Sequence, residues 1–328
     1  MLNININRIN VMAQKMTRRS FVKESARLTA AVTVAGSVLK PRLTAAAPSN
    51  AADPMPMGRI GKQEFSRLML GGNLISGYSH SRDLSYVSAL MRRYNTPAKI
   101  RETLEIAESH GINVMNLWIM DGITHLREHW KNGGKMKFIA QARVNQNDPL
   151  MQFKKAVDEG ASAVHPTGDT TDGLVAQGQL GLISKIVEFV RSQGVPAGIG
   201  YHGFKALETT IANGIDADFY QKTLHTLDYR SAPRTSAEFG ADDLGTWDNA
   251  WCRYPETVID TMAAVRKPFI AFKVLAAGAI KPEVGFPYAV NAGADFLLVG
   301  MFDWQIADDV RIAKEAFKKA QRTRPLFG

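Results

Sequence analysis

The sequence has little cysteine and lacks several compact functional motifs. Cys252 is the only cysteine among 328 residues. A single cysteine cannot form an internal disulfide, and it excludes a zinc site built from several cysteines. No H-E-x-x-H motif occurs, and no G-x-G-x-x-G loop follows the first predicted strand. We therefore expect neither a compact metalloprotease site nor the dinucleotide fingerprint of a doubly wound sheet.

The excess of positive charge is confined to the first part of the chain. The formal net charge is +9, yet residues 1–47 alone hold eight basic residues and one acidic residue. The remaining residues are close to electrically balanced. Because a nucleic-acid-binding domain carries its basic residues on the folded body, we expect no nucleic-acid partner.

Residues 1–47 have the pattern of an export signal. Residues 17–23 read Thr-Arg-Arg-Ser-Phe-Val-Lys, a weakly apolar run follows over residues 28–39, and three alanines end the segment at Ala47. This pattern resembles a twin-arginine signal peptide. It implies recognition by the twin-arginine machinery, which carries folded proteins, and a periplasmic or extracytoplasmic location. The apolar run is too short for a stable membrane anchor. The alternative is a short amphipathic helix with two chance arginines.

The segment that best shows the fold lies between residues 181 and 204. Four apolar residues follow the spacing of one helix face, namely Ile183, Ile186, Val187 and Val190. Gly194 is suited to end that helix, and residues 195–200 form a short apolar run typical of a buried parallel strand. The polar pair Tyr201-His202 comes next. Helix, strand and polar tip form one unit of an α/β fold.

This unit recurs after a predicted linker over residues 48–57. The expected strands cover residues 68–72, 112–118, 136–144, 162–165, 195–200, 217–224, 269–275 and 294–300. Besides the helix before Gly194, helical patterns cover residues 97–110, 149–159, 204–213, 255–265, 283–291 and 306–321. Eight such units over residues 58–328 predict a single domain with the α/β fold of a (β/α)₈ TIM barrel. A doubly wound sheet is the alternative.

Two of the loops that follow strands are long, and chemistry in such barrels lies on these loops. The first covers residues 73–96, and the second covers residues 225–254. The second loop contains the aromatic and acidic residues Trp247, Trp251, Asp242, Asp243 and Asp248. Tryptophan stacking and carboxylate hydrogen bonds favour a small, polar, sugar-like substrate. The alternative is a loop that only covers the barrel mouth.

Several segments resemble the aldo/keto reductase superfamily. Residues 58–62 (Gly-Arg-Ile-Gly-Lys) are similar to its N-terminal hairpin, and residues 111–113 (Gly-Ile-Asn) to the run before its second strand. Ile199-Gly200 with Phe204 is similar to its fifth strand, and residues 269–273 (Phe-Ile-Ala-Phe-Lys) to its seventh. The resemblance implies a barrel that reduces carbonyls with a nicotinamide cofactor, using Asp, Tyr, Lys and His, with Tyr as the proton donor.

Most of that catalytic set is replaced. Asn116 stands where the resemblance places Asp, and Asp121 stands where it places Tyr. The third strand has no lysine at its tip, although Arg143 lies one step away, and only His165 matches. We take His165, Asn116, Asp121 and Lys273 as candidate catalytic residues. Lys273 would stabilise an oxyanion or act as a general base, although lysine is also common there in reductase relatives.

The cofactor contacts implied by the resemblance are mixed. Gln221 aligns with a glutamine beside the nicotinamide amide, and Phe272 aligns with the aromatic residue on which the ring stacks. His202-Gly203 replaces the expected Ser-Asn pair, and residues 301–304 (Met-Phe-Asp-Trp) replace the basic residues that hold the adenosine phosphate. NAD(P) is therefore the alternative cofactor, and we predict poor NADPH binding.

Three histidines suggest a metal instead. His165, His202 and His225 stand at or just past the ends of the fourth, fifth and sixth strands, whose tips lie close together in a barrel. Neutral imidazoles bind divalent metals such as zinc, and Asp121 or Asp169 would complete the set. The alternatives are a hydrogen-bonded family residue at His165, a helix-capping residue at His202 and an ordinary reductase histidine at His225.

Three functions follow from these observations. The first is an exported enzyme that uses metal-assisted lyase, isomerase or hydrolase chemistry on a sugar-like substrate. The second is a divergent NAD(P)-dependent reductase exported with its cofactor bound. The third is a non-catalytic metabolite-binding barrel. We further predict a structural role for Cys252 and surface positions for His80, His110, His125 and His129.

Overall fold

The computed structural model describes residues 53–81, 84–234, 252–322 and 324–328. The predicted signal peptide over residues 1–47 lies outside them. So do Trp247, Trp251 and the three aspartates of the second long loop.

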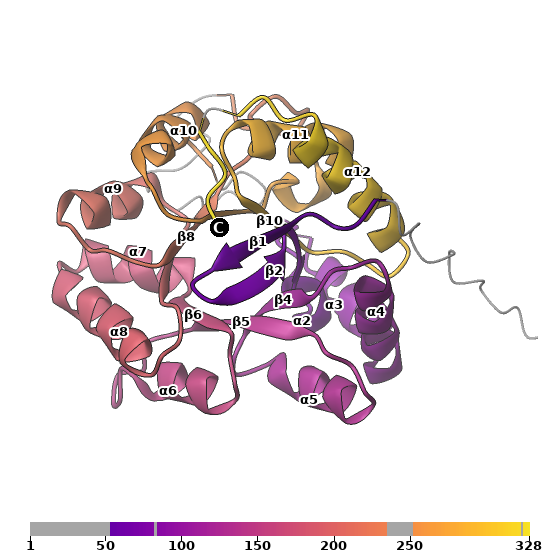
Figure 1. Cartoon of the computed structure of the whole chain (residues 1–328), viewed down its shortest axis with the longest axis horizontal. Coiled ribbons are helices and arrows are strands. Elements are labelled where there is room, and N and C mark those ends of the chain that lie inside the picture. The colour runs from indigo at the N-terminus through magenta and orange to yellow at the C-terminus, as the bar shows by residue number, and fades with distance from the viewer. Residues whose placement is uncertain (1–52, 82–83, 235–251, 323) are drawn as a thin grey trace, which may run out of the picture. The chain divides into compact units, whose positions relative to one another are not determined.

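Eight parallel strands form a nearly closed barrel, in the order β6-β5-β4-β3-β10-β9-β8-β7 (Figure 1). Their bounds are β3 Leu68–Gly71, β4 Val114–Trp118, β5 Lys137–Ala142, β6 Ala163–Pro166, β7 Gly198–Tyr201, β8 Phe219–Thr223, β9 Phe269–Phe272 and β10 Phe296–Val299. An isolated parallel bridge between Val164 and Ala197 joins β6 to the start of β7 and completes the circle. The predicted (β/α)₈ barrel is thus confirmed, and each expected strand is found.

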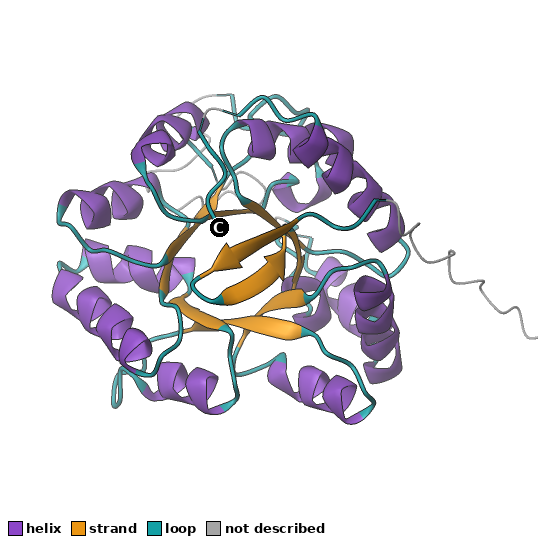
Figure 2. Ribbon diagram, viewed as in Figure 1, coloured by secondary structure: helices purple, strands orange, loops and turns teal. Residues whose placement is uncertain are grey.

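Helices surround the barrel (Figure 2). They are α2 Asn73–Ser76, α3 Tyr86–Tyr94, α4 Pro97–Ser109, α5 Ile123–Lys131, α6 Met151–Asp158, α7 Gly168–Ala176, α8 Leu180–Ser192, α9 Phe204–Ala212, α10 Pro255–Ala264, α11 Pro282–Asn291 and α12 Ile306–Lys318. Helices α2, α3, α5 and α7 were not expected from the sequence. Helix α7 has a weak pattern because Gly168, Thr170, Thr171 and Gly173 interrupt its apolar face.

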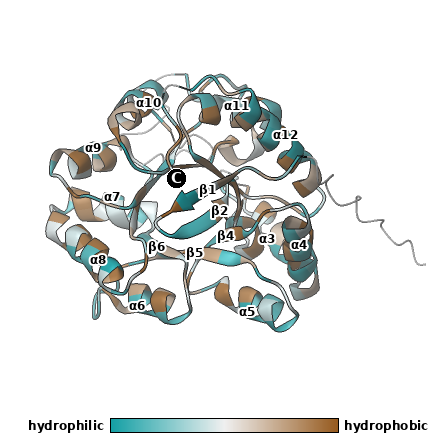
Figure 3. Cartoon of the chain, in the orientation of Figure 1, coloured by the Kyte–Doolittle hydropathy of each residue, from teal (hydrophilic) through white to brown (hydrophobic). Residues whose placement is uncertain are grey.

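Apolar residues form separate cores outside and inside the strands. The larger core lies between strands and helices and includes Ile183, Ile186, Val187 and Val190, the residues predicted to share one face of α8. The outer helices carry both hydrophobic and hydrophilic residues along their length (Figure 3). This arrangement is typical of helices that cover a sheet on one side and meet water on the other.

A hairpin closes the N-terminal end of the barrel. Strands β1 Met57–Ile60 and β2 Gln63–Ser66 pair antiparallel and lie across this opening (Figure 1). Ile60 and Phe65 are fully buried and share the inner core with Phe219 and Phe296. The opposite, C-terminal end therefore provides the mouth at which a site can form. No helix in the described ranges is long and apolar enough to cross a membrane.

Candidate functional site

Four polar side chains fill the middle of the barrel, and we call them the amide layer. They are Asn116 on β4, Gln141 on β5, His165 on β6 and Gln221 on β8. The Asn116 amide nitrogen Nδ2 donates to His165 Nε2 at 3.2 Å and to Gln221 Oε1 at 2.9 Å. Gln141 Nε2 donates to Asn116 Oδ1. Asn116 therefore connects three strands through one side chain.

Backbone geometry explains why the amide layer can form. Gln141 lies beside His165 in the strand register, and Gly200 on β7 lies beside Gln221. A Cβ atom on Gly200 would lie 2.9 Å from His165 Nδ1, so glycine leaves the room that the imidazole needs. His165 Nδ1 donates to the Pro166 carbonyl at 2.8 Å, which leaves Nε2 to accept from Asn116.

The two candidate catalytic residues of the amide layer are fully buried, whereas Gln141 is partly exposed. Asn116 and His165 are both 0% exposed. Burial lowers the pKa of His165 to about 4, so its imidazole is neutral near pH 7. The two residues were predicted to act on substrate. In the structure they are hydrogen-bonded to each other beneath the mouth, and their catalytic roles stay predictions from the sequence.

Cationic and imidazole side chains gather above the amide layer at the C-terminal end. We call His80, Arg143, His202 and Lys273 the cationic mouth. The His202 ring contacts the Phe272 ring with centroids 5.6 Å apart, and Lys273 Nζ lies 5.9 Å from the same Phe272 centroid. Arg143 follows β5, pairs with Asp169 at 3.0 Å and lies over the Trp118 ring.

The imidazoles of the cationic mouth are held in their neutral form. Burial lowers the pKa of His202 well below its usual value, and the charges of Lys273, Lys222, His80 and Arg143 lower it further. Burial and the charge of Lys273 lower the pKa of His80 to about 3. His80 was predicted to lie at the surface. It is partly exposed, and its imidazole bonds the Asn73 amide at 3.0 Å in the field of Lys273.

The backbone after β9 is strained where it presents Lys273. Lys273 has a φ angle of 58°, and Ala276 and Ala277 have φ angles of 45° and 55°. Residues with a Cβ atom rarely adopt this left-handed conformation. Strain of this kind persists only where the surrounding structure imposes it, and it concentrates at functional sites. Lys273 stays a candidate catalytic residue.

A buried carboxylate orients the His202 loop. Asp172 Oδ2 accepts the backbone N–H groups of His202 and Gly203, both at 3.0 Å, at the start of α9. Asp172 Oδ1 is buried and has no hydrogen-bond partner in the described ranges. Burial raises the pKa of Asp172 to about 7, against the opposing effect of the two backbone bonds and Lys222. Sequence reasoning missed Asp172 because it missed α7.

This burial makes stability depend on pH. The folded-state pKa of Asp172 lies above its unfolded value of 3.8, so its stabilising contribution is complete below pH 3.8 and is lost as pH rises through about 7. Between pH 3.8 and about 7, the free energy of unfolding of the wild type should fall by up to about 4 kcal/mol more than that of Asp172→Asn. Urea unfolding at pH 4 to 8 measures the difference. The exposed Asp158→Asn is the control, and parallel pH profiles for wild type and Asp172→Asn would refute the assignment.

The predicted three-histidine metal site does not form in the described part of the chain. No group of three or more His, Cys, Asp or Glu side chains there is placed to hold a metal ion. His165 uses both ring nitrogens within the amide layer and its own loop. His225 Nδ1 donates to the Thr226 carbonyl, and its Nε2 accepts the Cys252 N–H at 3.1 Å. These contacts do not support His165, His202 and His225 as a common ligand set. The divalent metal itself stays a prediction from the sequence.

Cys252 and Asp121 both lie outside the cationic mouth. Cys252 is 1% exposed, and its backbone orders the His225 ring. Asp121 lies in the turn between β4 and α5, where its charge acts on His125. Within the described ranges, no hydrogen bond connects the Asp121 carboxylate with the amide layer. Of the remaining histidines predicted at the surface, His110 and His129 are buried, with 8% and 2% exposure.

The positions expected to bind a nicotinamide cofactor are already engaged. Gln221 bonds Asn116, and His202 contacts the Phe272 ring on which nicotinamide would stack. Asp303 follows β10, where a cation would hold the adenosine phosphate, and it accepts from Tyr94 at 2.6 Å and Lys99 at 3.1 Å. A nearby cavity of about 200 Å³ is lined by acids as well as Arg311. Its acidic lining residues are Glu283, Asp308 and Asp309.

We predict that NADPH binds with a Kd weaker than about 100 μM, because acids at this position repel a 2′-phosphate. Fluorescence titration of the purified protein measures the affinity. Asp303→Ala serves as the comparison, because it removes one of the two acids that pair with Lys99, the other being Glu102 at 2.8 Å. This variant should bind NADPH better than the wild type. Micromolar binding by the wild type would contradict the prediction.

Comparison with known proteins supports the fold. No family model and no curated protein sequence matches the chain. Two solved structures from Pseudomonas aeruginosa, described as candidate aldo-keto reductases, have TM-scores of 0.54 and 0.52. They are 15% and 14% identical in sequence, each covers 80% of this chain, and the matches span 97% and 98% of their own chains. At this identity the likeness shows that the chain has an aldo-keto reductase-like (β/α)₈ barrel.

Proposed function

We propose that this chain is an enzyme that acts on a small, polar, sugar-like substrate at the C-terminal mouth of its barrel, by non-redox proton transfer of the isomerase or lyase type. The observation that carries the proposal is Lys273, held on a strained turn beside the neutral imidazole of His202. A cation next to a proton acceptor suits a reaction in which negative charge develops on a carbonyl oxygen. Export by the twin-arginine route belongs to the proposal and depends on residues 17–23.

The roles follow from the charges of these groups. The Lys273 ammonium, with Arg143 nearby, attracts the substrate oxygen that becomes negative. The His202 imidazole accepts the proton from the carbon next to the carbonyl, and the electron pair of that C–H bond moves onto the oxygen as an enediolate. Return of the proton to the former carbonyl carbon, with transfer of the hydroxyl proton from the second oxygen to the first, gives an isomer with the carbonyl moved by one carbon. Departure of a leaving group with its bonding electron pair from the next carbon, as the enediolate re-forms the carbonyl, gives a lyase product.

The low pKa of His202 fits this role once substrate binds. In the free protein, burial first and neighbouring cations second lower the pKa of the imidazole and keep it a weak base. A bound anion, or an oxygen gaining negative charge, offsets those cations and raises the pKa of His202 toward neutrality. Asp172 holds the backbone of His202 and so positions the ring, whose Nδ1 lies 3.9 Å from Asp172 Oδ2. We assign no step to a metal, because the described residues supply no ligand set.

Proton exchange tests the proposal without knowledge of the full reaction. Wild-type protein is incubated in D₂O with aldoses, ketoses, sugar acids and sugar phosphates, without nicotinamide, and NMR follows deuterium at the carbon next to the carbonyl. Lys273→Met and His202→Gln should each lower the exchange rate at least about 100-fold. Lys205→Met, whose side chain is 73% exposed on α9, should leave it unchanged.

Other outcomes of this experiment favour the alternative functions. Turnover that requires NAD(P)H would support a divergent reductase. Substrate binding without exchange in the wild type would support a metabolite-binding barrel. Exchange that survives both substitutions in the mouth would place the chemistry elsewhere.

A further inference from the structure

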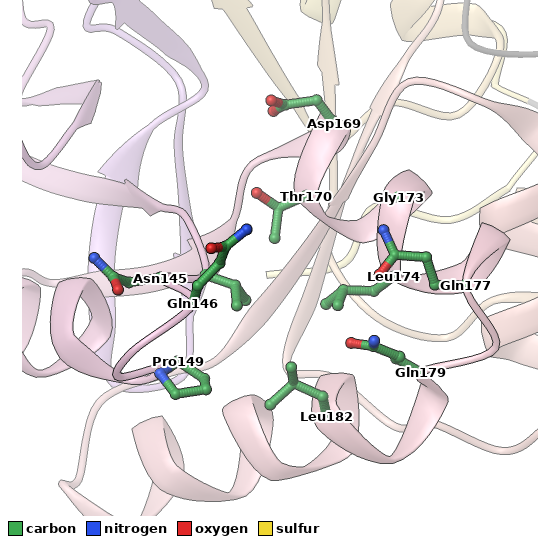
Figure 4. Close-up of a pocket in the computed structure, with 11 residues that line it drawn as sticks. Asn145, Gln146, Pro149, Asp169, Thr170, Gly173, Leu174, Gln177, Gln179 and Leu182 are labelled. Carbon is green, nitrogen blue, oxygen red and sulfur yellow. The ribbon is translucent and has the colours of Figure 1, made fainter.

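A separate groove lies outside the barrel, on the side of β5 and β6. It has a volume of about 550 Å³ and is bounded by the loop after β5 and by helices α7 and α8 (Figure 4). Its size falls within the range of about 300–1,000 Å³ typical of small-molecule sites. The chemistry of its walls indicates the kind of molecule that it would hold.

Neutral amides dominate the polar wall of the groove. Asn145 and Gln146 come from the loop after β5, whereas Gln177 and Gln179 follow α7 and precede α8. Figure 4 shows these amides placed around the same space. The side chains of Gln146, Gln177 and Gln179 have no hydrogen bond to another residue of the described ranges. Each amide can both donate and accept, which suits hydroxyl groups.

The groove carries no cationic side chain and has an apolar wall. The lining includes no Lys, Arg or His, and Asp169 is its one acidic residue. A phosphate or carboxylate ligand would therefore lack a charge partner. Leu174 and Leu182 line the side formed by the two helices, and Leu174 is 7% exposed. A ligand with hydroxyl groups at its edge and C–H groups on its face matches amides beside leucines.

Gly173 keeps the groove open. It lies inside α7, where glycine is less favourable than alanine. A Cβ atom on Gly173 would meet no atom within 4 Å, and its φ is helical, so neither close packing nor backbone conformation requires glycine. Gly173 stands between Asp169 and Gln177 at a spacing of four residues, on the helix face that lines the groove. A side chain at this position would occupy the space available to a ligand.

The groove adjoins the mouth through one ion pair. Asp169 lines the groove, and its carboxylate pairs with Arg143 of the cationic mouth at 3.0 Å. Arg143 thus neutralises the negative charge of Asp169. The other side chains that line the groove are uncharged.

We propose that this groove binds an uncharged polyhydroxyl ligand, such as a neutral mono- or disaccharide, at a site distinct from the mouth. The amides from two segments, the leucine wall, the absence of cations in the lining and the side-chain-free position at Gly173 support it together. The proposal does not depend on the reaction assigned to the mouth.

The test fills the groove without disturbing the fold. Calorimetric titrations use neutral mono- and disaccharides, with sugar phosphates as the charged comparison. Gly173→Leu places a side chain in the open space and favours the helix, so this variant should fold and bind the neutral sugar at least tenfold more weakly. Gly181→Leu is the matched control on α8, since a Cβ there also meets nothing within 4 Å and Gly181 does not line the groove. Its affinity should stay within twofold of the wild type.

Gln177→Leu checks the hydrogen-bonding part of the proposal, because it removes an amide and keeps the side-chain size. It should weaken neutral sugar binding about threefold to tenfold. The proposal is overturned if no neutral sugar binds the wild type, if sugar phosphates bind more tightly than neutral sugars, or if binding survives Gly173→Leu. Loss of binding in Lys273→Met with full binding in Gly173→Leu would place the sugar in the mouth instead.

Discussion

Replacement of Asp295 by alanine is expected to lower the free energy of unfolding by about 3–5 kcal/mol. Asp295 is 0% exposed and accepts the backbone N–H groups of Phe269 at 2.9 Å and Phe327 at 3.0 Å. Arg322 donates to it at 2.8 Å, and an Arg324 guanidinium nitrogen lies 3.6 Å away. Without the carboxylate, two largely buried guanidinium groups lose their counter-charge, which is the main source of the loss.

Urea unfolding monitored by circular dichroism measures this effect. Asp216→Ala is the control, because Asp216 also pairs with basic side chains, Arg191 and Lys267, but is 58% exposed. Solvent screens an exposed pair, so the control should change stability by less than about 1 kcal/mol. Equal losses of unfolding free energy in the two variants would show that burial does not determine how much Asp295 contributes to stability.

Replacement of Asn116 by leucine is expected to lower the free energy of unfolding by about 2–4 kcal/mol. Leucine has a similar size but makes no hydrogen bond, so His165, Gln141 and Gln221 each lose a partner inside the barrel. A buried polar group left without a partner costs more than the net value of the bond that it made. The same unfolding experiment measures the change.

Asn213→Leu is the matched control for this substitution. Asn213 is exposed at the end of α9, where its amide bonds the Thr209 carbonyl. Its replacement should lower stability by about 1 kcal/mol or less. A fully stable Asn116→Leu variant would mean that the three partners find other hydrogen bonds or water, and the amide layer would then have no structural role.

Local sequence pattern was sufficient to predict the barrel. Short apolar runs such as residues 195–200 alternate with helical faces such as that of α8, and Gly194 ends α8 with a φ angle of 75°. These features depend on neighbours a few residues apart, which a sequence displays directly. The weakly patterned α7 was missed, and with it one wall of the groove and the position of Asp172.

The sequence also located the residues near strand ends but not their partners. It placed His165, His202 and His225 at the ends of three successive strands, and this arrangement suggested that they bind one metal ion. Only the tertiary structure shows that His165 lies buried in the amide layer, His202 lies against Phe272 in the mouth, and His225 is bound by the Cys252 backbone.

The physical reason is that periodicity determines which side of a strand a residue faces, whereas depth and partner depend on contacts between distant segments. Asn116 and Gln221 are 105 positions apart and bond at 2.9 Å. His80 enters the field of Lys273 because the barrel closes β3 against β10 and β10 against β9. The sequence by itself determined the barrel and the end that holds its mouth. The closed tertiary structure decided which of the predicted side chains are buried beneath the mouth and which lie at it.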